Sequence, residues 1–308
     1  MKKRKDPTGK TCCSMNKKCS FVAIVGEPNA GKSTLVNDIV GEKISIVSSK
    51  VQTTRRPIRG IVELDAAQIV FIDTPGFCKA NSHLEKALIQ NFRHSYKDAD
   101  VIILVIDATS RNHDGSISFI EKFQESDKTF AVAINKTDIA KKEQLLELAD
   151  CLSKYEFIKE IFMISALKDD GVGAIKEFLK MTAPEGPWLY EEDQVTDLPM
   201  NLRLAEITRE KIFKMLEKEL PYSIYVETEI FREAEKKARI SQVIVVMKDS
   251  QKAIVLGRGG QMIKMIKEAA IADMADLFGK KIELKLFVKV KEKWTEKKAH
   301  LQNAGIID

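Results

Sequence analysis

Long hydrophobic runs and a regular cysteine pattern are both missing from this chain of 308 residues. The longest clean apolar run, residues 101–106, has the length of a strand and is too short to cross a membrane. The basic start at residues 1–5 is not followed by the apolar stretch of a signal peptide, so we expect no export. The cysteines form no CxxC pair and have no histidine spaced as a metal partner, which indicates reduced cytosolic thiols.

Composition places the chain among ordinary globular proteins, with 44% hydrophobic and 31% charged residues, and its length predicts two domains. The net charge of +5 is unevenly distributed. Residues 1–20 carry seven Lys/Arg and one Asp, residues 21–200 carry 21 basic against 28 acidic residues, and residues 201–308 carry 22 against 16. The basic last third predicts a polyanionic partner for that part, although a solvated helix face would give the same balance.

Short β-branched runs alternate with longer amphipathic stretches from Phe21 onward. The runs are nearly continuous in apolar residues, as expected for strands buried on both faces, and lie at residues 21–25, 69–72, 101–106, 131–134 and 161–164. This alternation predicts a doubly wound α/β sheet that is mostly parallel. Around residues 64–67 two strands are too close for a crossover helix, so we expect an antiparallel hairpin there.

The composition changes at residues 184–188, where Pro and Gly accumulate, and helical periodicity returns after Pro199. We therefore predict an extension or disordered tail at 1–18, a first domain at 19–183, a linker at 184–200 and a second domain at 201–308. In the second domain we expect a helix (about 201–219), two strands (222–231 and 240–248), helical segments after Gly260 and Ala270, and a strand (281–290). That order is typical of a smaller α+β domain, a KH domain of the bacterial type, followed by a basic helix at about 292–303.

A complete GxxxxGK[ST] motif occupies residues 26–33, directly after the first predicted strand and before a helix. In such a loop backbone N–H groups surround phosphates and the helix directs its N-terminus at the anion. Lys32 is expected to reach the β- and γ-phosphates, and Ser33 to bind Mg2+. The remaining nucleotide-contacting positions of the loop are Gly26, Asn29, Ala30, Gly31 and Thr34.

Two further groups predict the metal and γ-phosphate contacts of a P-loop GTPase. Thr54 lies in a polar loop before the hairpin, where a threonine would complete Mg2+ coordination when the γ-phosphate is present; an ordinary loop role remains open. Asp73 and Gly76 follow the third apolar run, with Asp73 holding the metal through water and the Gly76 N–H meeting the γ-phosphate. The predicted metal residues are Ser33, Thr54 and Asp73, and the predicted catalytic residues are Lys32, Asn29, Thr54 and Gly76.

The base is predicted by residues 135–138, Asn-Lys-Thr-Asp, and residues 165–167, Ser-Ala-Leu, which close two later strands. An aspartate at position 138 accepts from both N1–H and the exocyclic amine of guanine, a pair that adenine lacks. The expected nucleotides are therefore GTP and GDP. We expect Asn135 and the Ala166 N–H to face O6 and the Lys136 stem to pack on the ring, with Ser165 and Leu167 completing the loop.

Two residues bear on the mechanism of hydrolysis. Phe77 occupies the position at which Ras-like GTPases carry the glutamine that orients water, so another element must supply that assistance. Asn29 stands near the bridging phosphate oxygen, where a K+ ion would neutralise charge on the leaving group as an arginine finger does. The alternative is that Asn29 only stabilises the loop.

Residues 26–33, the stretch from 43–46 to 52–55, and residues 209–223 together resemble the bacterial Era GTPases, over about residues 18–298. The phosphate motifs occur in many GTPases, but their combination with a single carboxyl-terminal KH domain is specific to this family. The resemblance implies a GxxG loop at Gly257, Arg258, Gly259 and Gly260, and a ligand at the 3′ end of 16S ribosomal RNA during 30S subunit maturation. It also implies a cytoplasmic location with loose association with the inner membrane. We expect a monomer.

A GxxG turn lets the backbone approach a single strand and clamp about four nucleotides. Arg258, Lys264 and Lys267 are the nearest candidates to hold phosphates, while Lys289, Lys291, Lys293 and Lys297 either extend the path or form a solvated face. Met262, Ile263, Met265 and Ile266 are expected in the core. A tRNA-modification GTPase is the alternative function, but it needs a second catalytic site, and residues 201–308 contain no cysteine or metal cluster.

Overall fold

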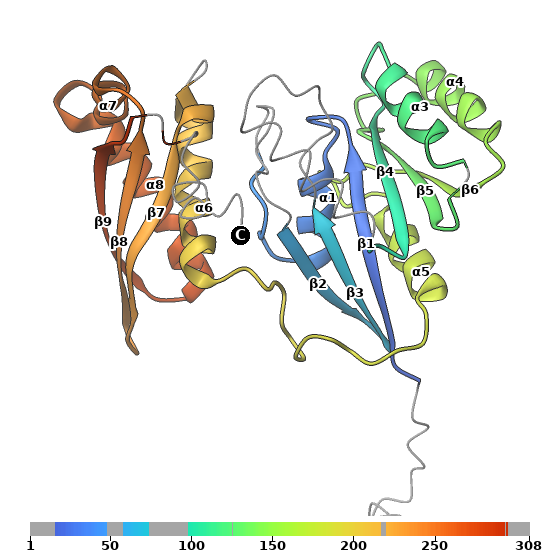
Figure 1. Ribbon diagram of the computed structural model, residues 1–308, viewed down its shortest axis with the longest axis horizontal. Helices are drawn as coiled ribbons and strands as arrows, with labels where there is room; N and C mark the ends of the chain where they lie inside the picture. Colours follow the sequence, from blue (N-terminus) through green and yellow to red (C-terminus); the bar gives the residue numbers. More distant parts are fainter. Residues whose placement is uncertain are drawn as a thin grey trace, which may run out of the picture.

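An α/β unit and a smaller α+β unit follow one another along the chain and are joined by an extended linker (Figure 1). The structure is a computed structural model that describes residues 16–47, 58–73, 98–124, 126–216, 220–292 and 294. Its elements are β1 (Lys18–Gly26), α1 (Lys32–Val40), β2 (Ile58–Leu64), β3 (Ala67–Asp73), β4 (Val101–Asp107), α3 (Asp114–Glu121), β5 (Thr129–Asn135), α4 (Lys142–Ser153), β6 (Ile158–Met163), α5 (Val172–Thr182), α6 (Met200–Met215), η1 (Leu220–Ser223), β7 (Tyr225–Glu233), β8 (Lys237–Val246), α7 (Asp249–Leu256), η2 (Arg258–Gly260), α8 (Gln261–Phe278) and β9 (Lys281–Val290). The predictions for Thr54, Gly76, Phe77, Lys293 and Lys297 lie outside the described residues.

The first sheet has six strands in the order β2-β3-β1-β4-β5-β6. The pairs β3-β1, β1-β4, β4-β5 and β5-β6 are parallel, and only β2 runs antiparallel to its neighbour β3. Two residues, Asp65 and Ala66, connect β2 to β3, and Asp65 adopts a positive φ of 55° there. The predicted doubly wound, mostly parallel sheet with one hairpin is confirmed.

Helices cover both faces of this sheet and bury two separate cores. On one face α1 and α5 pack against the sheet, with Leu35 and Leu179 in the core. On the other face α3 and α4 contribute Ile120 and Leu152. Alternate residues of β4 enter the two cores, which explains why its sequence is apolar without interruption. The loops that follow β1, β3 and β5 therefore meet at one edge of a rigid sheet.

The linker after α5 is held against the sheet along much of its length. Gln68, which is fully buried on β3, accepts from the backbone N–H groups of Leu189 and Tyr190 at 2.9 and 3.0 Å. Further on, the Ile61 N–H of β2 donates to Val195 O at 2.9 Å. In Figure 1 the linker passes along the β2 and β3 side of the first domain before it reaches α6.

The second unit has a three-stranded sheet in the order β7-β8-β9, with β7 antiparallel and β9 parallel to β8. Helices α6 and α8 pack on one face of it, where Ile212 and Ile266 share a core with Ile244. This arrangement confirms the smaller α+β domain of KH type. No helix among the described residues is long and apolar enough to span a bilayer.

The helices of the second domain differ from the prediction. One helix, α7, precedes Gly257, and a single helix, α8, runs through Ala270 without a break. Helix α7 was missed because its sequence is short and polar at the start; Gln251 stabilises its first turn by accepting from the Lys248 N–H at 3.2 Å. Helix α8 continues because Ile266, Ala270 and Met274 recur every four residues on its buried face.

Candidate functional site

The GxxxxGK[ST] loop connects β1 to α1 at the carboxyl edge of the sheet. Gly31 caps α1 with a φ of 100°, and no side chain caps the helix, so α1 directs the positive end of its dipole at the loop, where an anion would bind. A Cβ at Gly31 would lie 2.1 Å from Asn135 Nδ2. The position therefore requires glycine both for its backbone conformation and for the close approach of Asn135.

Lys32 lies across the same loop and is 7% exposed. Its ammonium donates to Glu27 O at 2.8 Å and to Gly26 O at 3.1 Å. These carbonyls place a positive charge at the mouth of the loop, beside the uncapped start of α1. Together the two features make a site for the phosphates of a nucleotide.

Ser33 and Asp73 form the described part of the predicted metal site. The Ser33 hydroxyl donates to Asp73 Oδ2 at 2.8 Å, and Asp73 is fully buried at the end of β3. A hydroxyl and a carboxylate are hard oxygen ligands of the kind that Mg2+ prefers. These residues therefore fit a magnesium ion beside the phosphate loop.

Asp138 is oriented by the loop that follows β6. Ser165 Oγ donates to Asp138 Oδ1 at 2.9 Å, and the Lys168 ammonium lies 3.4 Å from Oδ2. The hydrogen bond from Ser165 lowers the pKa of Asp138, burial opposes it, and Lys168 lowers it further. The carboxylate is thus kept ionised, which is the form that accepts two hydrogen bonds from guanine.

Asn135 joins the phosphate loop to the loop of residues 165–167. Its amide donates to Ala30 O at 2.8 Å, and its Oδ1 accepts from the Ala166 N–H at 3.0 Å. In this structure the Ala166 N–H and Asn135 bond to each other, and the contact of the two with guanine O6 stays a prediction. The sequence pattern did not reveal this role, because the contact depends on how closely the two loops approach.

Asp107 was not among the predicted site residues, although it ends β4 at the same edge of the sheet. Its carboxylate pairs with the Lys136 ammonium at 2.5 Å and accepts from the Thr109 hydroxyl at 2.6 Å. Burial raises the pKa of Asp107, but Lys136 and Thr109 lower it more, so the net direction is down. Asp107 orients the Lys136 side chain that was expected to pack on the base.

An open hollow of about 370 Å³ lies between α1, the loop after it and the loop of residues 165–167. Thr34 lines it from α1, and Ala166 and Leu167 line it from the opposite side. Leu167 is 80% exposed. Three of the predicted nucleotide-contacting residues, Thr34, Ala166 and Leu167, thus border one depression.

In the second domain, Gly257 ends α7 and turns the chain into η2 and α8. It has a φ of 71°, and a Cβ there would lie 2.8 Å from the Met262 backbone nitrogen. Gly259 and Gly260 also have positive φ but face open space. The glycines therefore form a tight turn whose outer side is open to a ligand backbone.

Apolar and basic side chains surround this turn. Ile254 and Met265 are 53% and 52% exposed, and Arg258 and Lys264 are exposed beside them. The prediction that Met265 belongs to the core is wrong, because the buried face of α8 follows Ile266 and Ala270. The exposed apolar atoms next to the glycine turn suit contact with unpaired bases.

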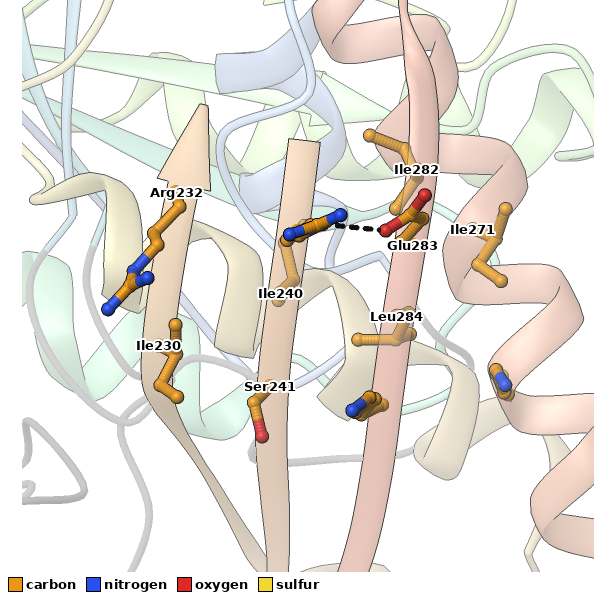
Figure 2. Close-up of a pocket in the computed structure, with 11 residues that line it drawn as sticks. Ile230, Arg232, Ile240, Ser241, Ile271, Ile282, Glu283 and Leu284 are labelled. Atoms are coloured by element: carbon orange, nitrogen blue, oxygen red, sulfur yellow. Dashed lines mark hydrogen bonds and ion pairs between the residues drawn. The ribbon is translucent and has the colours of Figure 1, made fainter. Parts of the chain in front are cut away.

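Beside α8 a groove of about 670 Å³ runs along the sheet (Figure 2). Ile271 of α8 lies next to Ile282 and Leu284 of β9 at its wall. Its charged lining is mainly cationic and consists of Arg232, Arg239, Lys267 and Lys285 with Glu283. An apolar floor with cationic edges fits a nucleic-acid strand.

Lys289 and Lys291 are engaged within the domain. Lys289 pairs with Glu229 at 2.9 Å, and Lys291 donates to the Tyr225 hydroxyl at 3.2 Å. Burial lowers and the Tyr225 hydroxyl raises the pKa of Lys291, which is raised on balance. These partners favour the solvated face over an extended phosphate path for the two lysines.

Two family models match the chain in succession. Residues 21–136 match a family described as a 50S ribosome-binding GTPase, and residues 219–295 match the KH domain family. The two matches fall on the two described domains, one on the nucleotide site and one on the glycine turn.

Full-length relatives match both domains together. GTPase Era of Mesorhizobium japonicum is 44% identical over 287 residues, which cover 93% of this chain and 93% of the relative. A crystal structure of Era with MgGDPNP and nucleotides 1506–1542 of 16S ribosomal RNA is 34% identical, with a TM-score of 0.87 over 95% of this chain and 100% of that chain. An Aquifex aeolicus Era variant bound to GDP and AlF4− gives the same TM-score and identity, over 94% of this chain and 100% of that chain.

Proposed function

The chain belongs to the Era family of GTPases, and from that premise we propose that it is a GTP-hydrolysing switch that assists assembly of the 30S ribosomal subunit. In this proposal the domain at residues 19–183 binds Mg2+ and GTP or GDP. The domain at residues 201–308 binds 16S ribosomal RNA near its 3′ end through Gly257, Arg258, Gly259 and Gly260. GTP orders the segment around Thr54, the RNA is engaged, and hydrolysis releases it.

We assign the nucleotide-site residues roles that their motifs predict and that the geometry of the first domain supports. Lys32 and the start of α1 hold the phosphates, Ser33 and Asp73 hold Mg2+, and Asp138 selects guanine. Mg2+ supplies charge neutralisation on the β- and γ-phosphates when it is bound. Asn135 and Asp107 keep the base loop and Lys136 in position. Thr54 and Gly76 are assigned to the metal and the γ-phosphate by their motifs.

The observation that carries the RNA assignment is the solved Era complex, in which a protein of the same two-domain fold holds a 16S fragment. The glycine turn, its exposed apolar neighbours and the cationic groove support the same ligand here. The first domain's family description names the 50S subunit instead, so the subunit requires a direct test. The tRNA-modification alternative has no support in the second domain, which matches a KH family.

Crosslinking the GTP-bound protein to total ribosomal RNA, followed by sequencing of the contacts, tests this proposal. We expect contacts at the 3′ end of 16S RNA and on 30S precursors. Contacts confined to 23S RNA would contradict the small-subunit assignment. On the same family premise we place the protein in the cytoplasm as a monomer, with loose contact with the inner membrane.

Potassium dependence tests the role of Asn29 in hydrolysis. We expect GTP hydrolysis to be several-fold faster in K+ than in Na+, because an ion at Asn29 would neutralise charge on the leaving phosphate. The measurement is the single-turnover rate in matched chloride salts. Asn29→Gly and Asn29→Ala should both lose the difference.

Asn29→Gly isolates the effect of the side chain better than Asn29→Ala, because Asn29 has a φ of 63°. Glycine keeps that backbone conformation, whereas alanine adds strain of about 1 to 2 kcal/mol. Equal wild-type rates in the two salts would contradict the proposed K+ ion. The source of the assistance that a glutamine gives at the position of Phe77 would then stay unassigned.

A further inference from the structure

A buried carboxylate of the second domain contacts the loop that leads to Thr54. Glu210 lies on α6 and is 1% exposed, and α6 is the helix that faces the first domain in Figure 1. Its Oε1 accepts from the Val47 N–H at 3.4 Å, and its Oε2 accepts from the Lys43 ammonium. Residues 42–47 follow α1 and precede the segment that carries Thr54.

The charges around Glu210 form one network across the domain interface. Lys43 also pairs with Asp273 of α8 at 2.8 Å, and Asp273 pairs in turn with Lys211. Lys214 lies 3.1 Å from Glu210 Oε1. Burial raises the pKa of Glu210, but Lys43 and then Lys214 lower it more, so the carboxylate is ionised.

The same loop is anchored to the nucleotide domain on its other side. Asn37 of α1 accepts from the N–H groups of Ile44 and Ser45 at 3.0 and 2.9 Å. Glu42, Lys43 and Val47 line the hollow that also contains Thr34 of α1. The loop therefore contacts α1, the helix that follows the phosphate loop, on one side and the second domain on the other.

A second attachment lies beyond the Thr54 segment. Arg59, at the start of β2, pairs with Asp197 of the linker at 2.8 Å, and its carbonyl accepts from the Thr196 hydroxyl at 2.7 Å. On the near side of the segment, Arg203 of α6 pairs with Glu42 at 2.6 Å. The chain is thus tied to the second domain or its linker both before and after Thr54.

From these contacts we propose that Glu210 is a positioning residue for GTP hydrolysis, acting from the RNA-binding domain on the loop of residues 42–47. The inference rests on the proposed role of Thr54 as a Mg2+ ligand. Glu210 fixes Val47 and Lys43, and that loop sets where the Thr54 segment begins. A small displacement of a group that completes a metal site is enough to slow the chemical step. GDP lacks the γ-phosphate with which Thr54 is expected to act, so we expect GDP binding to be independent of Glu210.

The test compares Glu210→Ala, Glu210→Gln and Lys43→Met in the full-length protein. Glu210→Ala should lower kcat about fivefold and weaken GDPNP binding about fivefold, with GDP binding unchanged. It should also raise the Mg2+ concentration needed for half-maximal hydrolysis. Glu210→Gln keeps an acceptor for the Val47 N–H and should lie between wild type and alanine. Lys43→Met should resemble glutamine, and combining the two should add little.

Glu268→Ala is the control, because Glu268 lies on α8 of the same domain, its side chain is 64% exposed, and its distance to Lys264 is long, at 3.9 Å. It should leave all three measurements unchanged. The inference is overturned if Glu210→Ala matches this control, or if GDP and GDPNP weaken equally. If Glu210→Ala fails to fold, the test is the GDPNP-to-GDP affinity ratio of Glu210→Gln and Lys43→Met. A ratio equal to that of the wild type would overturn the inference. A wild type that hydrolyses no GTP would defeat the proposed function, while that ratio would still test Glu210.

Discussion

Asp138→Asn is expected to move the nucleotide preference from GTP toward xanthosine triphosphate, with GTP affinity falling roughly 100-fold. The carboxylate accepts from both N1–H and the exocyclic amine of guanine, whereas an amide can donate to the 2-oxo group of xanthine. Asparagine keeps an oxygen that can accept from Ser165 Oγ, which lies 2.9 Å from Asp138 Oδ1. The base loop should therefore persist while its specificity changes.

Competition between labelled GTP and unlabelled xanthosine triphosphate measures this change directly. Asp150→Asn is the control, since Asp150 is 77% exposed on α4 and pairs only weakly, at 3.6 Å, with Lys154. It should bind GTP as the wild type does. An Asp138→Asn protein that still prefers GTP would disprove the assignment of guanine recognition to Asp138.

Gly259→Asp is expected to reduce affinity for the 3′ end of 16S RNA by about two orders of magnitude. The substitution places a side chain and a negative charge where the phosphate backbone must approach most closely, so steric and Coulomb effects act together. Beyond its chain neighbours, no atom lies within 4 Å of the position that a Cβ would occupy, so the cost to the fold is the strain of a side chain at a φ of 60°, about 1 to 2 kcal/mol. GTP hydrolysis should be unchanged, because Gly259 is not at the interface between the domains.

Gly279→Asp provides a matched control for this variant. Gly279 has a φ of 59° against 60° at Gly259, and it too faces open space, but it lies at the far end of α8. Filter binding of both variants, paired with a GTPase assay, separates a local effect on RNA from a general effect of the charge. Intact RNA affinity in Gly259→Asp would reduce residues 257–260 to a simple turn.

Salt dependence accompanies the same titration. Wild-type RNA binding should weaken with salt at a log-log slope of about −0.7 for each phosphate neutralised.

The sequence was sufficient where a function depends on contiguous residues. The phosphate loop needs its glycines and Lys32 at fixed spacing between a strand and a helix, and Asp138 follows a buried strand, so the places of both in the fold were predictable. The doubly wound sheet could also be predicted from the sequence, because strands buried on both faces are apolar throughout.

Contacts between distant segments were not predictable in the same way. The link from Asn135 to Ala30 depends on how closely two loops approach, and the pair of Asp107 and Lys136 depends on adjacent strands. In the sequence Glu210 cannot be distinguished from other charged residues of a helix, because only the packing of α6 against the first domain buries it. The exposure of Met265 likewise depends on which face of α8 the sheet covers.

The linker has one further consequence, for solubility. Strand β2 is the outermost strand of its sheet, and such a strand offers unpaired N–H and C=O groups to the edge strand of another molecule. Here the backbone of Val195 accepts from Ile61, and Thr196 bridges Gly60, so the linker occupies part of that edge. The segment that joins the domains therefore also protects the sheet from intermolecular strand pairing and aggregation.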